Sequence, residues 1–439
     1  MNDTIVAIAT SMASPAGINI IRISGEDSLT SVKAIFTAKD FDNIVPNKMY
    51  LGKIICENFI EKAFCVYYKA PKSYTGEDVT EIHCHGGKIV TEAIVRAICN
   101  QGIRPAHAGE FTKRAFLNNK LTLDEAEGIF GIINAASESD LKNSSRLMEG
   151  ELGKGIVENE NLLISAAALL EAALDYPEEI EEDNTILAKI NLEIVKNNID
   201  KLLNTEKYAK ILREGAFVAI IGRPNSGKSS LLNALLRQDR AIVSDIAGTT
   251  RDILNESVEI EGIKINFVDT AGIRESDNVI EGMGIERAKR AIEYADIVIY
   301  LQDTTVSENQ EEIEIEKLLK DKKVIYVANK TDIGTFDKKG IKISAKYRIN
   351  MEELISKIMS LIEKEAIASQ TIITNERHIY ALKAAKTHVD DALNGFSAAP
   401  LECILVDIKS ALGELGRITG KEISESVVDE IFSKFCVGK

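Results

Sequence analysis

The chain has 439 residues, a length that predicts about three domains at roughly 150 residues each. Its 53 basic and 68 acidic residues leave a net charge of −15, which excludes a protein that holds nucleic acid by bulk electrostatic attraction alone. With 45% apolar and 28% charged residues, the composition is typical of a globular chain and excludes predominant disorder.

Neither a membrane span nor a secretory leader is evident. The apolar stretch from Ile164 to Leu174 is interrupted by Glu171 and is shorter than the about 18 residues that a span needs. The N-terminus contains Asp3 and lacks a basic flank before its short apolar run. We therefore expect a cytoplasmic protein without membrane association.

The cysteines form no C-x-x-C pair, so the sequence predicts neither a disulfide framework nor a zinc ribbon. His83, Cys84 and His85 are adjacent and include zinc-ligating side chains. In a strand, however, residues 83 and 85 point to one face and residue 84 to the other, which disfavours a metal site.

The N-terminal region, residues 1–118, is predicted to be an α+β domain. Short alternating or β-branched runs predict strands at Ile18–Ile23, Ala63–Tyr68 and Val79–His83, and helical periodicity predicts a helix at Ile89–Cys99.

Residues 119–213 and 366–439 are predicted to be helical. Apolar residues recur there at helical spacing, for example Leu187, Ile190 and Ile194. The acidic run from Glu178 to Asp183 is expected to be a solvated loop or the N-terminus of a helix.

Residues 214–365 alternate between apolar strands and helical patterns, which predicts a parallel sheet covered on both faces. The strand Phe217–Ile221 precedes a glycine-rich turn and a helix at Ser229–Leu236. The other predicted strands are Ile263–Val268, Ile297–Leu301, Val324–Ala328 and Ile341–Ile343. The predicted fold class is therefore a multidomain protein: an α+β N-terminal domain, a discontinuous α-helical domain and an inserted α/β P-loop domain.

The turn after the first α/β strand, Gly222-Arg-Pro-Asn-Ser-Gly227-Lys228-Ser229, fits the P-loop pattern G-x-x-x-x-G-K-S/T. Its glycines let backbone N–H groups approach phosphates, Lys228 can bridge the β- and γ-phosphate oxygens, and the Ser229 hydroxyl can bind Mg²⁺.

Three further motifs follow predicted strands in the order that a guanine-nucleotide site requires. Asp269-Thr270-Ala271-Gly272 places a carboxylate and a glycine N–H near the magnesium and γ-phosphate. In Asn329-Lys330-Thr331-Asp332, the aspartate can accept two hydrogen bonds from guanine, which adenine cannot supply. Ser344-Ala345-Lys346 completes the base pocket.

Between the P-loop and Asp269, the segment Asp245-Ile246-Ala-Gly-Thr249-Thr250-Arg-Asp is a candidate switch loop, with Thr250 as a candidate magnesium ligand. An apolar residue, Ile273, follows Gly272 where many small GTPases have a glutamine that orients water. Lys228 and Glu281 are therefore the candidate catalytic residues, although a solvated acid is the simpler reading of Glu281 before any resemblance is considered. The expected GTP contacts are Gly222, Asn225, Ser226, Gly227, Lys228, Ser229, Ser230, Ser244, Thr249, Thr250, Asp269, Thr270, Ala271, Gly272, Asn329, Lys330, Asp332, Ser344, Ala345 and Lys346.

Over its whole length the chain resembles the MnmE (TrmE) family of tRNA-modifying GTPases. Outside the nucleotide motifs, the resemblance rests on Ile21-Arg22-Ile23-Ser24-Gly25, Tyr74-Thr75-Gly76-Glu77-Asp78, His85-Gly86-Gly87, Gly109-Glu110-Phe111-Thr112-Lys113-Arg114-Ala115-Phe116 and the terminal Phe435-Cys436-Val437-Gly438-Lys439. The segment Thr10–Gly17 departs from the family's glycine-rich pattern.

The resemblance implies that the N-terminal domain dimerises and binds a tetrahydrofolate derivative, in the 5,10-methylene or 5-formyl form. It assigns the folate contacts to Arg22, Glu81, Lys120 and Lys439, which suit the pterin edge and the anionic glutamyl tail. It also leaves a possible thiol role for Cys436, for which the simpler expectation is a buried, inert thiol.

The resemblance further implies a potassium-stimulated GTPase. Its potassium ligands map to Asn225, Val243, Asp245, Ile246 and Thr249, and Glu281 matches the family's water-orienting glutamate. A monovalent cation there can neutralise charge that develops on the phosphates.

The implied function is addition of a (carboxymethyl)aminomethyl group to C5 of the tRNA wobble uridine. The implied partner is the FAD-dependent MnmG (GidA), in a heterotetramer or larger assembly, with FAD on the partner alone. Two alternatives remain: a regulatory or ribosome-assembly GTPase of the Era or Der type, and an N-terminal dimerisation domain whose folate site is vestigial.

Overall fold

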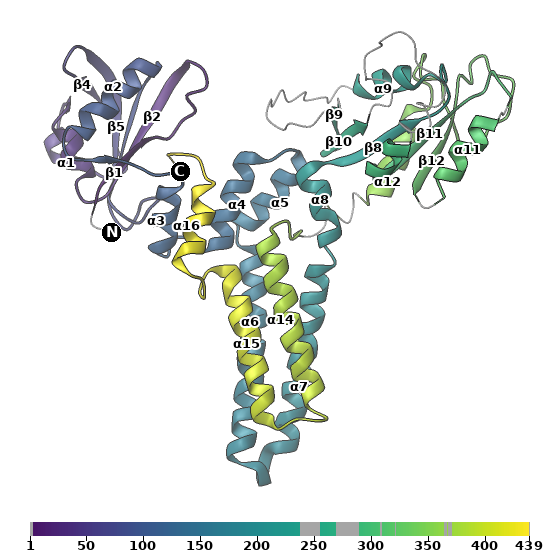
Figure 1. The fold of residues 1–439 in the computed structure, drawn as a ribbon. Coiled ribbons are helices and arrows are strands. Elements are labelled where there is room, and N and C mark those ends of the chain that lie inside the picture. The colour runs from purple at the N-terminus through teal and green to yellow at the C-terminus, as the bar shows by residue number, and fades with distance from the viewer. Residues whose placement is uncertain are drawn as a thin grey trace. The chain divides into compact units, whose positions relative to one another are not determined.

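The structure is a computed structural model that describes residues 3–237, 255–268, 289–307, 310–320, 322–363, 367 and 371–438 (Figure 1). The chain divides into two compact units. The first unit consists of Met1–Phe130, Met148–Asn161 and Leu412–Lys439, and the second of Gly131–Leu147 and Leu162–Ala411.

The first unit contains a 7-stranded sheet in the order β3-β4-β5-β6-β2-β1-β7. Its strands pair antiparallel except β1 and β7, which are parallel. The strands are β1 (Ile5–Ile8), β2 (Ala16–Ser24), β3 (Phe36–Ala38), β4 (Met49–Ile55), β5 (Ile60–Tyr68), β6 (Val79–Gly86) and β7 (Arg104–Pro105).

One face of this sheet is buried with α1 (Ser28–Lys33) and α2 (Lys88–Cys99) in an apolar core that includes Ile23, Ile82 and Ile94. The predicted strands in β2, β5 and β6 and the predicted helix α2 are confirmed. Cys84 is buried while His85 is exposed, as the alternation of a strand requires.

The outer face of β4 and β5 carries exposed apolar residues. Leu51 and Phe64 are direct cross-strand partners, and so are Ile55 and Ile60. The exposed fractions of these four residues lie between 42% and 64%. The exposed cross-strand pair Lys53–Lys62 lies between these two apolar pairs on the same face.

The C-terminal segment also packs within the first unit. Phe432 and Phe435 are buried against Leu123, which begins α4 (Leu123–Asn134). Lys113 of α3 (Glu110–Leu117) forms an ion pair with Asp429 of α16 (Glu425–Ser433). Val437 pairs with Ala108 in an isolated antiparallel bridge.

The helical part of the second unit is built from both sides of the α/β region, as the sequence predicts. Contacts join α7 (Pro177–Leu203) to α14 (Glu376–Gly395), including the ion pairs Lys196–Asp390 and Lys386–Asp200. The acidic run lies in the first turns of α7 and is therefore a helix N-terminus. The segments that flank the α/β region also contain α5 (Glu138–Met148), α6 (Glu151–Asp175), α8 (Glu206–Glu214) and α15 (Leu401–Thr419).

The α/β region contains a 6-stranded sheet in the order β13-β12-β11-β8-β10-β9. The strands are β8 (Ala216–Ile221), β9 (Asn255–Ile260), β10 (Ile263–Val268), β11 (Ile297–Asp303), β12 (Lys323–Asn329) and β13 (Ile341–Lys342). Apolar cores lie on both faces, against α9 (Lys228–Leu236) and α12 (Met351–Ile362) on one side and α11 (Gln310–Leu318) on the other.

One strand of this sheet was not predicted, and at this edge the sheet departs from the expected parallel pairing. β9 pairs antiparallel with β10 at the sheet edge. The two strands are joined by Glu261 and Gly262, whose positive φ angles of 51° and 84° form a tight hairpin turn. Only one face of this edge strand is covered. Apart from Val258 and Ile260, which are buried, the residues of β9 are polar, so its sequence does not show the continuous apolar run of a buried strand.

Within the part of the chain that the structure describes, no helix is long and apolar enough to cross a lipid bilayer.

Candidate functional site

The P-loop connects β8 to α9 at the carboxyl end of the parallel strands. Asn225 and Gly227 have positive φ angles of 63° and 98°. A Cβ atom on Gly227 would lie 2.3 Å from the side-chain nitrogen of Asn329, so the loop needs glycine there for both its conformation and its close packing.

Lys228 points into the loop. Its Nζ donates hydrogen bonds of 2.8 Å to the carbonyl oxygens of Gly222 and Arg223. Ser229 and Ser230 lie exposed in the first turn of α9, whereas Ser226 is buried. The N-terminal N–H groups of α9 and the Lys228 ammonium together form a concentration of positive charge suited to phosphates.

Asn329 connects the P-loop to the predicted base pocket. Its Nδ2 donates to the Ser226 carbonyl at 2.8 Å, and its Oδ1 accepts the N–H of Ala345 at 3.0 Å. Ser344 Oγ donates to Asp332 Oδ1 at 2.7 Å, which holds this carboxylate beside the Ser344–Ala345 backbone. These contacts bring together motifs that are about a hundred residues apart in the chain.

Lys330 is positioned by Asp303, at the carboxyl end of β11, through an ion pair of 2.6 Å. Burial by itself would raise the pKa of Asp303, but hydrogen bonds from Lys330 and Thr305 outweigh it and lower the pKa below its ordinary value. Lys346 lies exposed beside the pocket, with its Nζ 5.1 Å from the ring centroid of Tyr347.

Several predicted site residues lie outside the described residues, and the structure places none of them. They are Val243, Ser244, Asp245, Ile246, Thr249, Thr250, Asp269, Thr270, Ala271, Gly272, Glu281 and Lys439.

A second group of predicted residues meets on the first unit. Arg22 on β2 and Glu81 on β6 are cross-strand partners, and Arg22 Nε lies 2.8 Å from Glu81 Oε1. The Arg22 guanidinium also lies 5.2 Å from the ring centroid of Tyr74 and 5.8 Å from that of Phe111. Burial raises the pKa of Glu81, but contacts with His83 and Arg22 dominate and lower it.

The structure places Lys120 and the C-terminal segment, described as far as Gly438, in the same unit. Lys120 Nζ donates to the Pro71 carbonyl at 3.0 Å, and its side chain packs beside Gly76. Gly438 lies against the carbonyl of Ile8 on β1, the strand next to β2. Cys436 is exposed, so the expectation of a buried thiol is wrong: only the neighbouring Phe435 faces the core.

Sequence reasoning missed two kinds of supporting residue. His83 lies 3.5 Å from Glu81 Oε2, and the only signal for it is its position two residues along the same strand face. Asp303 could have been found as a carboxylate at the end of a buried parallel strand, where ligand-binding side chains gather.

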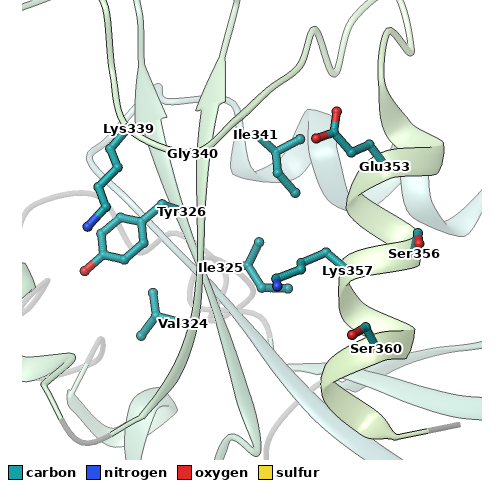
Figure 2. A pocket seen from close by; sticks show the side chains of 10 residues that line it. All are labelled: Val324, Ile325, Tyr326, Lys339, Gly340, Ile341, Glu353, Ser356, Lys357 and Ser360. Carbon is teal, nitrogen blue, oxygen red and sulfur yellow. The ribbon is translucent and has the colours of Figure 1, made fainter.

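Two other features lie apart from these residues. A cavity of about 600 Å³ lies beside the beginning of β12, whereas Asn329 ends that strand (Figure 2). His388 and Asp391 on α14 and Asp407 on α15 have potential metal-ligand atoms within 4.8 Å of one another, on the helical bundle.

Comparisons with known proteins cover the entire chain. The family model described as "GTP-binding protein TrmE N-terminus" matches residues 4–120, and the model described as "MnmE helical domain" matches residues 123–436. Two curated relatives are each named tRNA modification GTPase MnmE. The relative from Clostridioides difficile is 40% identical over 458 residues, covering 100% of both chains. The relative from Caldicellulosiruptor saccharolyticus is 40% identical over 459 residues, covering 100% of this chain and 99% of its own.

A solved structure of Era from Aquifex aeolicus is 29% identical over 39% of this chain and 66% of that chain, with a TM-score of 0.26. The assignment rests on the family models and the full-length relatives. The chain belongs to the MnmE (TrmE) family.

Proposed function

We propose that this protein is a potassium-stimulated GTPase of the cytoplasm that acts in the modification of tRNA. With the FAD-dependent partner MnmG (GidA), it adds a (carboxymethyl)aminomethyl group to C5 of the wobble uridine, using a one-carbon unit from a tetrahydrofolate derivative. The observation that carries the GTPase part is the Asn329 network, which joins the P-loop to the Asp332 and Ser344–Ala345 base pocket.

GTP recognition follows from this network. The Asp332 carboxylate accepts hydrogen bonds from guanine, and the Ser344 hydroxyl fixes its orientation. The phosphates lie against the P-loop backbone and Lys228, where positive charge is concentrated. Adenine presents an acceptor where guanine presents a donor, so the pocket rejects ATP.

Hydrolysis breaks the bond between the γ-phosphorus and the bridging oxygen as water attacks, giving GDP and phosphate. Ser229, exposed at the start of α9, is suited to hold Mg²⁺ with Thr250, and the metal supplies charge neutralisation for the phosphates. Lys228 stabilises negative charge on the phosphate oxygens, and Glu281 orients the attacking water. The exposed Asn225 side chain in the P-loop is suited to bind K⁺, with Val243, Asp245, Ile246 and Thr249 as further ligands.

The folate part rests on the charge arrangement of the first unit. Arg22 and Glu81 present a cation and a carboxylate side by side, next to the Tyr74 and Phe111 rings. Such a set suits a planar pterin with donors and acceptors on one edge. Lys120 and Lys439 are assigned to the anionic tail. The exposed Cys436 thiol lies in the same C-terminal segment and is available for chemistry.

The assembly is proposed to be a homodimer through the first unit, and the exposed apolar pairs Leu51–Phe64 and Ile55–Ile60 on β4 and β5 support a contact there. This homodimer binds MnmG in a heterotetramer or larger complex. The proposed domain bounds are 1–118, 119–213, 214–365 and 366–439.

The experiment that tests the function is mass spectrometry of wobble uridine in tRNA from cells that lack this protein. We expect unmodified C5 positions, restored by the wild-type gene and not by an Asp332→Asn variant. Normal modification in the deletion strain, together with a ribosome-assembly defect, would favour the Era or Der type of switch. Titration of the purified chain with 5-formyl-tetrahydrofolate tests the one-carbon role separately, and absence of binding would indicate a vestigial folate site.

A further inference from the structure

The end of β11 contacts the segment that carries the predicted base pocket. β11 and β12 are neighbouring parallel strands, and Asp303 and Asn329 are Cα partners at their carboxyl ends (Figure 1). Asp303 and the next residue, Thr304, are buried although both are polar, with exposed fractions of 7% and 4%. Buried polar side chains require hydrogen-bond partners, so the partners of these two show what each of them holds in place.

Thr304 fixes the backbone that follows β12. Its N–H and its hydroxyl both donate to the carbonyl oxygen of Asn329, at 3.1 and 2.8 Å. Its own carbonyl accepts the N–H groups of Thr335 and Phe336, each at 3.0 Å. The backbone of residues 329–336 is therefore held at both ends by contacts that the Asp303 side chain does not make.

The Asp303 carboxylate holds the side chain of Lys330 instead. Its Oδ1 accepts the N–H and the hydroxyl of Thr305, at 2.8 and 2.6 Å. Its Oδ2 accepts a hydrogen bond from Lys330 Nζ at 2.6 Å. Among the residues that the structure describes, no other carboxylate forms an ion pair with Lys330. Because Thr305 orients the carboxylate and the carboxylate anchors the ammonium, the long Lys330 side chain is ordered although 31% of it is exposed.

We propose that Asp303 is a positioning residue that slows the release of guanine nucleotide by acting through Lys330. The inference rests on the proposed GTPase function. Lys330 lies two residues before Asp332, whose carboxylate accepts hydrogen bonds from the edge of the base. With its ammonium anchored at Asp303, the aliphatic stem of Lys330 packs against the base, and the nucleotide does not have to order this side chain when it binds.

Asparagine at position 303 isolates the anchoring role. It keeps the shape of the side chain and one acceptor for Thr305, but it turns an amide donor toward the Lys330 ammonium. The contacts of Thr304 with the backbone remain. Asp303→Asn therefore removes the anchor of Lys330 and leaves the rest of the predicted base pocket in place.

The test measures the release of N-methylanthraniloyl-GDP (mant-GDP) from the full-length protein by stopped-flow fluorescence, with Mg²⁺ present and excess GDP as the competitor. We expect Asp303→Asn to release mant-GDP at least about fivefold faster than the wild type, because a charge-assisted hydrogen bond that orders the site is lost. KM for GTP should rise, whereas kcat at saturating GTP should stay within about twofold, since the P-loop is unchanged.

Asp337→Asn is the matched control. Asp337 lies between β12 and β13, is 87% exposed, and forms an ion pair of 2.8 Å with Lys342. The substitution removes the same charge from the same connection without touching Lys330. It should leave the release of mant-GDP and KM for GTP at their wild-type values.

Two further comparisons separate the positioning role from a general loss of structure. In a Lys330→Ala background, Asp303→Asn should have no additional effect on release, because the side chain that Asp303 positions is gone. Thr305→Val removes the hydroxyl that donates to Asp303 and should speed release about twofold, whereas Thr305→Ser keeps this donor and should match the wild type.

The inference is overturned if Asp303→Asn releases mant-GDP at the wild-type rate, if Asp337→Asn speeds release equally, or if the effect of Asp303→Asn persists in full without Lys330. If Asp303→Asn does not fold, equal release rates from Thr305→Val and Thr305→Ser overturn it. A wild-type protein that binds no mant-GDP at all would instead overturn the proposed GTPase function, and this inference with it.

Discussion

Asp332 shows how a single carboxylate can select a base. Its Oδ1 already accepts a hydrogen bond from Ser344, so the side chain is oriented before the nucleotide arrives. Asparagine keeps that acceptor but replaces the other oxygen with a donor, which opposes the donors of guanine and matches the additional carbonyl of xanthine.

We therefore expect Asp332→Asn to lose at least about 100-fold in GTP affinity and to gain affinity for xanthosine triphosphate. Isothermal titration calorimetry with GTP and with xanthosine triphosphate measures the two affinities. Unchanged GTP affinity would contradict the base pocket.

Asn225 is the proposed potassium ligand in the P-loop. It lies in the P-loop with a left-handed backbone and an exposed side chain, so its amide oxygen can reach a cation beside the phosphates. We expect faster GTP hydrolysis in KCl than in NaCl at equal ionic strength, and we expect Asn225→Ala to lose this difference. Steady-state phosphate release measures both rates. Equal wild-type rates in the two salts would refute the assignment.

Glu110 is the most strongly shifted carboxylate outside the candidate sites. Arg104 binds it through two hydrogen bonds of 2.6 and 2.8 Å, and Arg114 adds a third of 2.9 Å. Burial raises its pKa, but these bonds and the His107 N–H dominate and lower the pKa from 4.5 to about 2. The stabilisation is therefore complete above the unfolded-state pKa and is lost as the pH falls toward the folded-state value.

Glu110→Gln should cost about 3 kcal/mol of unfolding free energy at neutral pH, and the difference from wild type should shrink as the pH falls from about 5 to about 3. Urea unfolding at several pH values measures this trend. Glu92→Gln, on the exposed face of α2, is the control and should change stability by less than about 0.5 kcal/mol. A pH-independent difference would show that Glu110 acts through packing alone.

At the scale of elements, the sequence predicts the buried strands of the 6-stranded sheet and one of its two edge strands. β8, β10, β11 and β12 are apolar because both of their faces are covered, so their sequences alone identify them. β9 escapes detection because one of its faces is polar, whereas the two-residue edge strand β13 lies within the predicted strand Ile341–Ile343.

The candidate sites could likewise be predicted only in part. The P-loop and the Asn329–Asp332 motif are local patterns at strand ends, so their positions could be predicted. The bond from Asn329 to the Ser226 carbonyl and the pairing of Lys330 with Asp303 depend on which strands become neighbours in the sheet. No single stretch of sequence determines such pairings between distant segments.

Gly340 lets the chain pass close to β12 immediately before β13 begins. Its φ angle is 106°, and a Cβ atom there would lie 2.0 Å from the Tyr326 carbonyl oxygen. Gly340→Ala should therefore destabilise the protein by about 3 kcal/mol, because β13 must move away from β12.

Gly102→Ala is the matched control for this substitution. Gly102 has a similar φ of 90° but no atom within 4 Å of the added Cβ, so only the backbone cost of about 1 kcal/mol applies. Thermal unfolding of the two variants compares them directly. Equal losses would mean that the close approach to Tyr326 has no energetic consequence.

At the scale of the whole molecule, the net charge of −15 shapes the view of tRNA binding. A protein that grips tRNA through many phosphate contacts shows an affinity that falls steeply with salt. The acidic chain instead suggests that tRNA is held largely by a more basic partner or by a local surface formed in the complex.

The exposed apolar pair Leu51–Phe64 allows the proposed dimer to be tested. Leu51 and Phe64 lie opposite each other with exposed fractions of 63% and 42%, so a charge placed there would be buried in the proposed interface. We expect Phe64→Glu to convert the dimer to a monomer in light scattering after gel filtration, because an unpaired buried carboxylate costs several kcal/mol. Ile164→Glu, at a residue 55% exposed on α6, is the control and should leave the dimer intact. A Phe64→Glu protein that stays dimeric would move the interface to another surface.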